Sequence, residues 1–267
     1  MKRSNLIRLF MQKGKVFMQI TFENIHKHTQ LLTENDLYQH YHFPEMLSRY
    51  DSNYIEFKRF PSLGELKVAE RYLREFHRKN GQKHVKFKFP VNEKIPADLV
   101  NYLNKEHYDI GFLELYAIEP NQFPKVKDHP DIEVQIVTNQ YLKAFLALQF
   151  QQDIVFGSNF ANQKVELNKK IFEDPNFMQL LALYKGTPAG AVDVIISEDT
   201  AEIDNLGVDE AFQMKGIGSR IQKFVMDTFH DKTVILVADG QDTPKEMYKR
   251  QNYQYFGYQY YTQKVEG

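Results

Sequence analysis

The segment Gln213-Met214-Lys215-Gly216-Ile217-Gly218 has the residue types needed to bind a phosphate group. Gly216 and Gly218 carry no side chains, so backbone N–H groups there can approach an anion closely and adopt a positive φ. An amphipathic helix is predicted to start in this loop, and its first N–H groups have no partner within the helix. Converging amides at the positive end of a helix dipole form an anion site, to which Lys215 and Arg220 add charge.

The strand before this loop, residues 201–208, has an irregular hydrophobic pattern. Apolar Ala201 and Ile203 alternate with polar residues, but the alternation changes phase before Leu206 and Val208. Because side chains alternate with period two along a strand, an extra residue near Asp204-Asn205 is the simplest explanation. We therefore predict a β-bulge there, which leaves backbone donors and acceptors free to pair with a ligand.

The strand Ile203–Val208 and the loop Gln213–Gly218 together resemble the signature of the GNAT superfamily of N-acetyltransferases, Gln/Arg-x-x-Gly-x-Gly/Ala after a bulged strand. The resemblance covers residues 132–262 and implies a GNAT acyltransferase fold, an α/β fold with a mixed sheet, and acetyl-CoA (coenzyme A) as the cofactor. In this family the loop amides bind the CoA pyrophosphate, and the bulged strand holds the pantetheine arm. The cofactor-binding positions that match are Leu206, Gly207, Val208, Gln213, Met214, Lys215, Gly216, Ile217, Gly218 and Ser219.

The resemblance also implies direct attack of a neutral primary amine on the acetyl thioester. Tyr248 matches the tyrosine that in many members protonates the leaving thiolate, although Asn252-Tyr253 replaces the usual Gly-Phe that follows. Asparagine tolerates the left-handed cap conformation, so this replacement is mild. Glu202 and Asp204 flank the bulge, and the catalytic base is left open between them and water alone. Asn205 is a candidate for contacting the substrate.

Other kinds of site fit this sequence less well. The loop is neither Gly-x-Gly-x-x-Gly nor Gly-Lys-Ser/Thr, which argues against a dinucleotide fold and a Walker phosphate loop. The pairs His26-x-His28 and His40-x-His42 could suggest a metal, but no carboxylate spacing completes a known site, so solvated histidines and no metal are predicted. The alternative function is a non-catalytic acyl-CoA-binding or regulatory protein on the same scaffold.

Composition limits the class of protein. The 267 residues are 42% hydrophobic, enough for substantial cores, and 34 basic against 35 acidic residues give no electrostatic case for nucleic acid or a membrane surface. The absence of cysteine excludes disulfides and a cysteine nucleophile. We find no apolar run of the length of a signal peptide core or a spanning helix, and expect a soluble, cytoplasmic protein acting on a small-molecule or peptide amine. A homodimer is compatible with the sequence.

Three prolines between residues 119 and 131 mark the predicted domain boundary. We expect a poorly structured segment at 1–17, a smaller α/β domain at 18–125 and the GNAT domain at 130–267. The order strand, helix, strand, helix, strand at 54–118 repeats at 201–262, so the first domain is interpreted as a degenerate GNAT-like half. It has no Gln-x-x-Gly-x-Gly, and Leu103 stands where the second half has Tyr248, so one cofactor per chain is expected. The acceptor pocket is expected from residues 142–172 and the N-terminal domain.

Hydrophobic periodicity locates the elements. Helices are predicted at 66–78, 97–106, 142–150, 165–172, 217–229 and 243–250. Strands are predicted at 54–60, 84–89, 110–118, 132–137, 177–184, 190–196, 201–208, 233–237 and 255–262.

Overall fold

The computed structural model of the chain describes residues 10–12, 15–17, 19–241 and 244–266. Near the start, β1 (Phe10–Gln12) and β2 (Lys15–Phe17) pair as an antiparallel hairpin, in a segment where we expected no regular structure. The remaining residues of that segment, 1–9 and 13–14, lie outside the described residues. In the part of the chain that is described, no helix is both long and apolar enough to span a bilayer.

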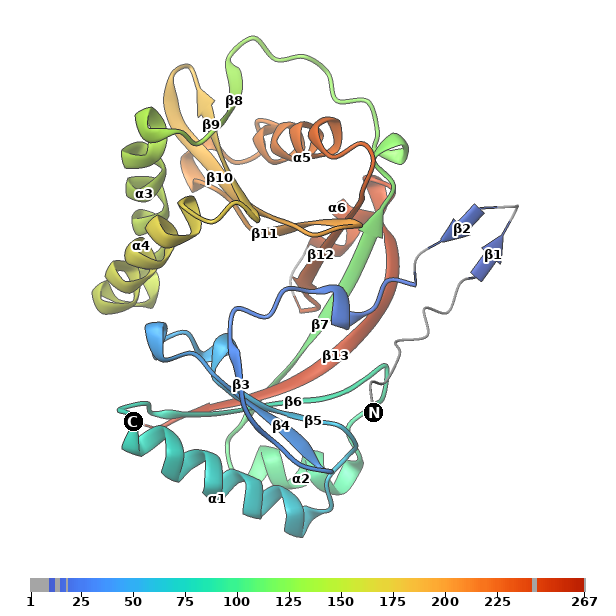
Figure 1. Cartoon of the computed structure of the whole chain (residues 1–267), viewed down its shortest axis with the longest axis vertical. Coiled ribbons are helices and arrows are strands. Elements are labelled where there is room, and N and C mark those ends of the chain that lie inside the picture. Colours follow the sequence, from blue (N-terminus) through green and yellow to red (C-terminus); the bar gives the residue numbers. More distant parts are fainter. Residues whose placement is uncertain (1–9, 13–14, 18, 242–243, 267) are drawn as a thin grey trace.

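Eleven strands form one mixed sheet, which confirms the predicted fold class (Figure 1). The first half of the chain contains β3 (Gln30–Glu34), β4 (Tyr38–His42), β5 (Tyr54–Phe57), α1 (Leu63–Lys79), β6 (His84–Val91), α2 (Ala97–Lys105) and β7 (Asp109–Ile118). The second half contains β8 (Ile132–Ile136), α3 (Asn139–Asp153), α4 (Ser158–Phe172), β9 (Phe177–Tyr184), β10 (Thr187–Ile196), β11 (Thr200–Val208), α5 (Ile217–Thr228), β12 (Thr233–Asp239), α6 (Pro244–Arg250) and β13 (Gln254–Val265). The hairpin of β3 and β4 was not predicted.

The two halves repeat one backbone pattern. The series β5-α1-β6-α2-β7 matches β11-α5-β12-α6-β13, and in each series the first two strands are parallel. After α2, His107 has φ 60°, and the N–H of Tyr108 donates to the carbonyl of Leu103 over 2.9 Å. After α6, Asn252 has φ 67°, and the N–H of Tyr253 donates to the carbonyl of Tyr248 over 3.0 Å. The backbone therefore supports the predicted correspondence of Leu103 with Tyr248.

The closing strand of each half is exchanged. The order of the sheet is β3-β4-β5-β6-β13-β7-β12-β11-β10-β9-β8, so β13 lies between β6 and β7, and β7 pairs with β12. Figure 1 shows β7 and β13 running side by side through the middle of the molecule, between the helices of the two halves. The centre of the sheet is consequently built from both halves of the chain.

Three hydrophobic clusters cover the two faces of the sheet in the second half, one on the α5 face and two on the opposite face. On the α5 face, Ile203 and Val208 of β11 pack with Ile217 and Ile221 of α5. On the opposite face, α3 packs on β9 and β10, and the N-terminal segment (residues 19–29) packs on β7 and β12. A side chain on β11 therefore points either toward α5 or toward α3 and the N-terminal segment.

Candidate active site

The predicted bulge is present in β11. Asp193 of β10 pairs with Asp204, but Ala191, two residues earlier, pairs with Gly207, three residues later, so β11 carries one extra residue. Asn205 has φ 54° at this point, a conformation that asparagine adopts more readily than most residues. The bulge turns Asn205 to the face opposite α5, where its amide donates to Oε1 of Gln149 over 2.9 Å.

The strands β11 and β12 diverge beyond the bulge. Their parallel pairing joins residues 200–203 to residues 233–236 and stops at Ile203, although β11 continues to Val208 and β12 continues to Asp239. The backbone of residues 204–208 therefore has no β12 partner. An extended ligand could pair with this free edge in the manner of a strand.

The loop before α5 presents free backbone amides. Gly216 is the N-cap of α5 with φ 83°, and no side chain caps the helix. The helical hydrogen bond from the N–H of Arg220 to the carbonyl of Gly216 is 3.1 Å long, and the preceding three amides have no partner within the helix. The corresponding helix α1 is closed instead, because Ser62 and Glu65 form a reciprocal capping box. Of these two helices, α5 alone offers an open anion site.

A basic cleft of ≈ 470 Å³ adjoins this loop. It lies between the start of α5 and the connection of the two halves, with Lys125, Lys127, Lys215 and Arg220 among its lining residues. Arg220 pairs with the exposed Asp128 over 2.9 Å. The remaining positive charge suits a ligand with several phosphates.

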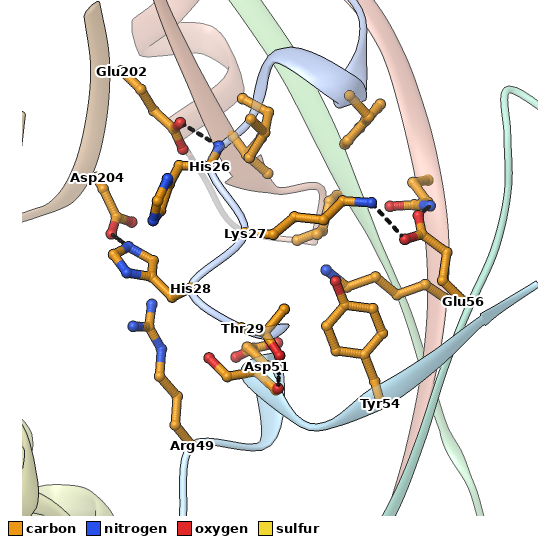
Figure 2. A pocket seen from close by; sticks show the side chains of 17 residues that line it. His26, Lys27, His28, Thr29, Arg49, Asp51, Tyr54, Glu56, Glu202 and Asp204 are labelled. Carbon is orange, nitrogen blue, oxygen red and sulfur yellow. Dashed lines mark hydrogen bonds and ion pairs between the residues drawn. The ribbon is translucent and has the colours of Figure 1, made fainter. Parts of the chain in front are cut away.

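A second cavity, of ≈ 250 Å³, lies on the face opposite α5, at the point where β11 and β12 diverge (Figure 2). Glu202 and Asp204 of β11 line it together with residues of the N-terminal segment, and we call it the interdomain pocket. A carboxylate oxygen of Glu202 accepts the backbone N–H of His26 over 2.8 Å. The Nε2 atom of His28 lies 3.1 Å from Oδ2 of Asp204.

Burial separates the pKa values of the two carboxyl groups. Burial raises the pKa of Glu202 to about 8, an effect that the His26 N–H partly offsets and the charge of Asp204 reinforces. Burial would also raise the pKa of Asp204, but the hydrogen bond with His28 and the charge of Arg49 hold it well below its usual value. Burial lowers the pKa of His28. At pH 7, Asp204 is ionised, His28 is neutral and Glu202 is largely protonated.

Comparison with known proteins agrees with this geometry. Residues 142–253 match the model of the acetyltransferase (GNAT) family. The second half of the chain belongs to the GNAT family. Residues 20–116 match a domain of unknown function (DUF5613). No curated protein matches the sequence significantly.

Solved structures extend the similarity to the whole chain. A functionally unknown conserved protein from Staphylococcus epidermidis is 32% identical, with a TM-score of 0.86 over 93% of this chain and 99% of its own. GCN5-related N-acetyltransferases from Kribbella flavida and Sphaerobacter thermophilus share the fold, each at 14% identity. Their TM-scores are 0.57, over 90% of both chains, and 0.61, over 91% of this chain and 83% of that chain. The chain thus shares a family with the staphylococcal protein and a fold with the two acetyltransferases.

Tyr248 lies on the α5 face of the GNAT half. Its ring packs against the hydrophobic core there, 5.2 Å from the ring of Tyr116 and 5.5 Å from that of Tyr253. Leu206 and Val208 of β11 and Ala238 of β12 pack against the same core. Tyr248 therefore lies on the same face of the sheet as side chains from both strands beyond the point where they diverge. Glu202 and Asp204 reach the site from the other face, which separates the predicted acid from the predicted bases.

The sequence analysis missed three charged or titratable residues of the interdomain pocket, which are His26, His28 and Arg49. His26 and His28 were interpreted as solvated, yet both rings lie beside the β11 carboxylates, with their centroids 4.5 Å apart. Arg49, from the connection between β4 and β5, lines the same pocket. Among the described residues, no three His, Asp or Glu side chains are grouped so as to hold a metal. Only the spacing His26-x-His28 could have drawn attention to this segment, because the contacts bridge 176 residues of sequence.

Proposed function

We propose that the protein is an N-acetyltransferase that moves an acetyl group from acetyl-CoA to a primary amine. The observation that carries the proposal is the divergence of β11 and β12. On the α5 face the gap adjoins the free amides and the basic cleft, and on the opposite face it adjoins the interdomain pocket with its carboxyl groups and histidines. A thioester lying in this gap would have its phosphates at α5 and its acyl carbon beside the interdomain pocket. Membership of the GNAT family supports this arrangement.

The loop and the bulged strand would hold the cofactor. The amides of Ile217, Gly218 and Ser219 would donate to the pyrophosphate, and Lys125, Lys127 and Lys215 add positive charge near it. The backbone of residues 206–208, which has no β12 partner, would pair with the pantetheine arm. A backbone N–H at the bulge would stabilise the oxyanion that develops on the thioester carbonyl.

The reaction is an acyl transfer in a ternary complex. The neutral amine nitrogen attacks the thioester carbon, a C–N bond forms and the C–S bond breaks, so that the products are an amide and CoA. The amine loses a proton to a base, and the departing sulfur gains one from an acid, which we assign to Tyr248. Positioned acids and bases contribute about 10²- to 10⁴-fold each to such reactions.

We assign the base to His28, oriented by Asp204. The depressed pKa makes Asp204 a weak base by itself, but an ionised carboxylate bound to Nε2–H fixes the ring so that Nδ1 carries the lone pair. The depressed pKa of His28 keeps this lone pair free at pH 7. Glu202, with a pKa of about 8, becomes a base only in more alkaline solution. Asn205, which is held by Gln149, borders the same site.

Calorimetric titration with acetyl-CoA tests the proposal. We expect micromolar binding with one site per chain, because α1 is closed by its capping box. Gly218→Val should abolish binding, since a branched side chain would stand among the free amides of α5. Gly64→Ala is the matched control, because Gly64 lies in the first turn of α1 with no atom near its Cβ position.

The possible outcomes separate three interpretations. Binding that depends on Gly218, followed by thiol release with an amine, supports the enzyme. Binding without transfer to any amine would leave a regulatory acyl-CoA-binding protein. A stoichiometry of two, or no binding at all, would contradict the assignment of the loop.

A further inference from the structure

The interdomain pocket contains more charged groups than the attack of an amine requires. Its acidic residues outside β11 are neutralised by neighbours: Glu56 pairs with Lys27 over 2.8 Å, and Asp51 pairs with Lys86. Asp204 is bonded to His28. The carboxylates of this pocket are therefore largely satisfied within the protein, and the open charges are positive.

Arg49 is the first of these open charges. Figure 2 shows its side chain extending toward His28, on the side of the pocket where Asp204 lies. Within the described part of the chain, its guanidinium makes no hydrogen bond and no ion pair within 4 Å, and one terminal nitrogen is buried without a partner. Arg49 as a whole is half-buried, but a guanidinium nitrogen that is out of contact with water and has no partner is costly.

Lys164 of α4, which is not among the residues that line the pocket, is a second cation near Arg49 without a partner. It is 5% exposed, and among the described residues its ammonium group makes neither a hydrogen bond nor an ion pair. Burial and the positive charge of Arg49 lower the pKa of Lys164, an effect that the charges of Asp193, Asp204 and Asp153 partly offset. The aspartates therefore compensate part of this charge, and a further anion beside Arg49 and Lys164 would reduce the remaining repulsion between them.

Nearby polar atoms without partners indicate that this region is built to meet a ligand or water. Both side-chain polar atoms of Asn168 and one oxygen each of Asp153 and Asp193 are buried without a hydrogen bond within the described structure. These residues come from α3, α4 and β10, and the charges of Asp153 and Asp193 act on Lys164.

We propose that the amine acceptor also carries a carboxylate, and that Arg49, supported by Lys164, binds it while the amine faces His28 and Asp204. This inference rests on the proposed acyl transfer and specifies its substrate class, a free amino acid. A guanidinium matches a carboxylate with two parallel hydrogen bonds, which would satisfy the open donors of Arg49. The volume of ≈ 250 Å³ is below the range of about 300–1,000 Å³ that is typical of pockets for larger ligands, so a small acceptor is favoured.

Paired acceptors test the carboxylate directly. The twenty common amino acids are screened by thiol release from acetyl-CoA, and the best ones are compared with their decarboxylated amines and their carboxamides, such as leucine with 3-methylbutylamine and leucinamide. The carboxamide keeps the size of the carboxylate but removes its charge. We expect kcat/KM to be about 10- to 100-fold higher for the acid, as one or two charge-assisted hydrogen bonds provide.

Variants assign the effect to its residues. Arg49→Met keeps most of the apolar stem and should remove the preference for the acid over the amine, mainly through KM, whereas Arg49→Lys should retain part of it. Lys164→Met should reduce the preference less. Arg78→Met, at a 71% exposed side chain on α1, is the control and should keep the full preference. Equal kcat/KM for acid and amine in the wild type, or a preference that survives in Arg49→Met, would overturn the inference.

Binding without turnover separates this inference from the proposed function. Thermal unfolding is measured with each amino acid in the presence of CoA. Stabilisation by amino acids that disappears in Arg49→Met, without any transfer, would uphold the carboxylate site and refute the acetyltransferase. Equal transfer to amines with and without a carboxylate would uphold the acetyltransferase and refute the carboxylate site. Absence of both binding and transfer would refute the acetyltransferase and the carboxylate site together.

Discussion

Three buried histidines in the first half should make the protein sensitive to mild acid. His40, His77 and His84 are at most 1% exposed, and burial lowers the pKa of His40 and of His77 to about 4 and that of His84 to about 3. Nδ1 of His77 donates to the carbonyl of His84, and Nε2 of His84 donates to the carbonyl of Asn53. A second proton must therefore go to His77 Nε2 or His84 Nδ1, both of which are buried without a partner.

The sign and size of the effect follow from these values. Each folded pKa lies below the unfolded value of 6.5, so the unfolded chain binds more protons and stability falls as the pH decreases from 6.5 toward 4. For a pKa of 4 against 6.5, the loss at pH 5 is about 2 kcal/mol for each histidine. Native domains are stable by about 5–15 kcal/mol in total, so the cluster alone could remove a large share.

Isosteric variants measure this contribution. In His77→Asn the amide nitrogen replaces Nδ1, and in His84→Gln it replaces Nε2, so both variants keep the donor but cannot be protonated. Urea unfolding is followed at pH 7.5 and pH 5 by circular dichroism, because the chain has no tryptophan. Each variant should be less stable at pH 7.5 but lose about 2 kcal/mol less than the wild type on acidification. The exposed His230→Gln is the control.

Wild type and variants must be compared because other titratable groups change the stability in the opposite direction to the histidines as the pH falls. Burial raises the pKa of Glu202 and of Asp193, so these carboxyl groups add stability as the pH falls through their folded values of about 8 and about 6. Their contribution is the same in wild type and variants and cancels in the difference. Equal losses in wild type, His77→Asn and His84→Gln would refute the reasoning, since the buried rings would then not determine the acid response.

Two further predictions concern the transfer step. Tyr248→Phe should lower kcat by about 10- to 100-fold while the Kd of acetyl-CoA stays nearly constant, and turnover equal to wild type at saturating substrate would remove Tyr248 as the acid. At pH 7, His28→Gln and Asp204→Asn should each lower kcat by about 10²- to 10⁴-fold. Glu202→Gln, which mimics the protonated carboxyl, should lower kcat much less at that pH, and a larger loss than in His28→Gln would transfer the role of base to Glu202.

The elements that we propose to hold the cofactor were predictable because their signals are local. The phase change between Ile203 and Leu206 required an extra residue, and the bulge at Asn205 supplies it. The glycines of the loop and the apolar face of α5 predicted the helix start at Ile217 to the residue. The hairpin of β3 and β4 was missed because β3 is exposed along its whole length and shows no alternation of buried and exposed positions.

The proposed acceptor side was not predictable, because its contacts are distant in sequence. The His28–Asp204 contact joins residues 176 apart, and nothing near His28 in the sequence indicates that partner. Arg49 follows no motif, and its importance comes from what surrounds it after folding. A histidine pair or an isolated arginine in a sequence of mixed charge is usually solvated, so the sequence alone favoured that interpretation.

The exchange of closing strands explains why the first half is part of the site. Both neighbours of β13, which are β6 and β7, come from the first half, and both neighbours of β7, which are β13 and β12, come from the second. Neither half can complete its hydrogen bonding alone, since separating them would leave β12 with an unpaired edge and β13 with two. Because β7 and β12 are thereby fixed side by side, the N-terminal segment that packs on both of them brings His28 to Asp204. The reactive geometry is therefore a property of the whole sheet, and the domain of unknown function supplies one wall of the proposed active site.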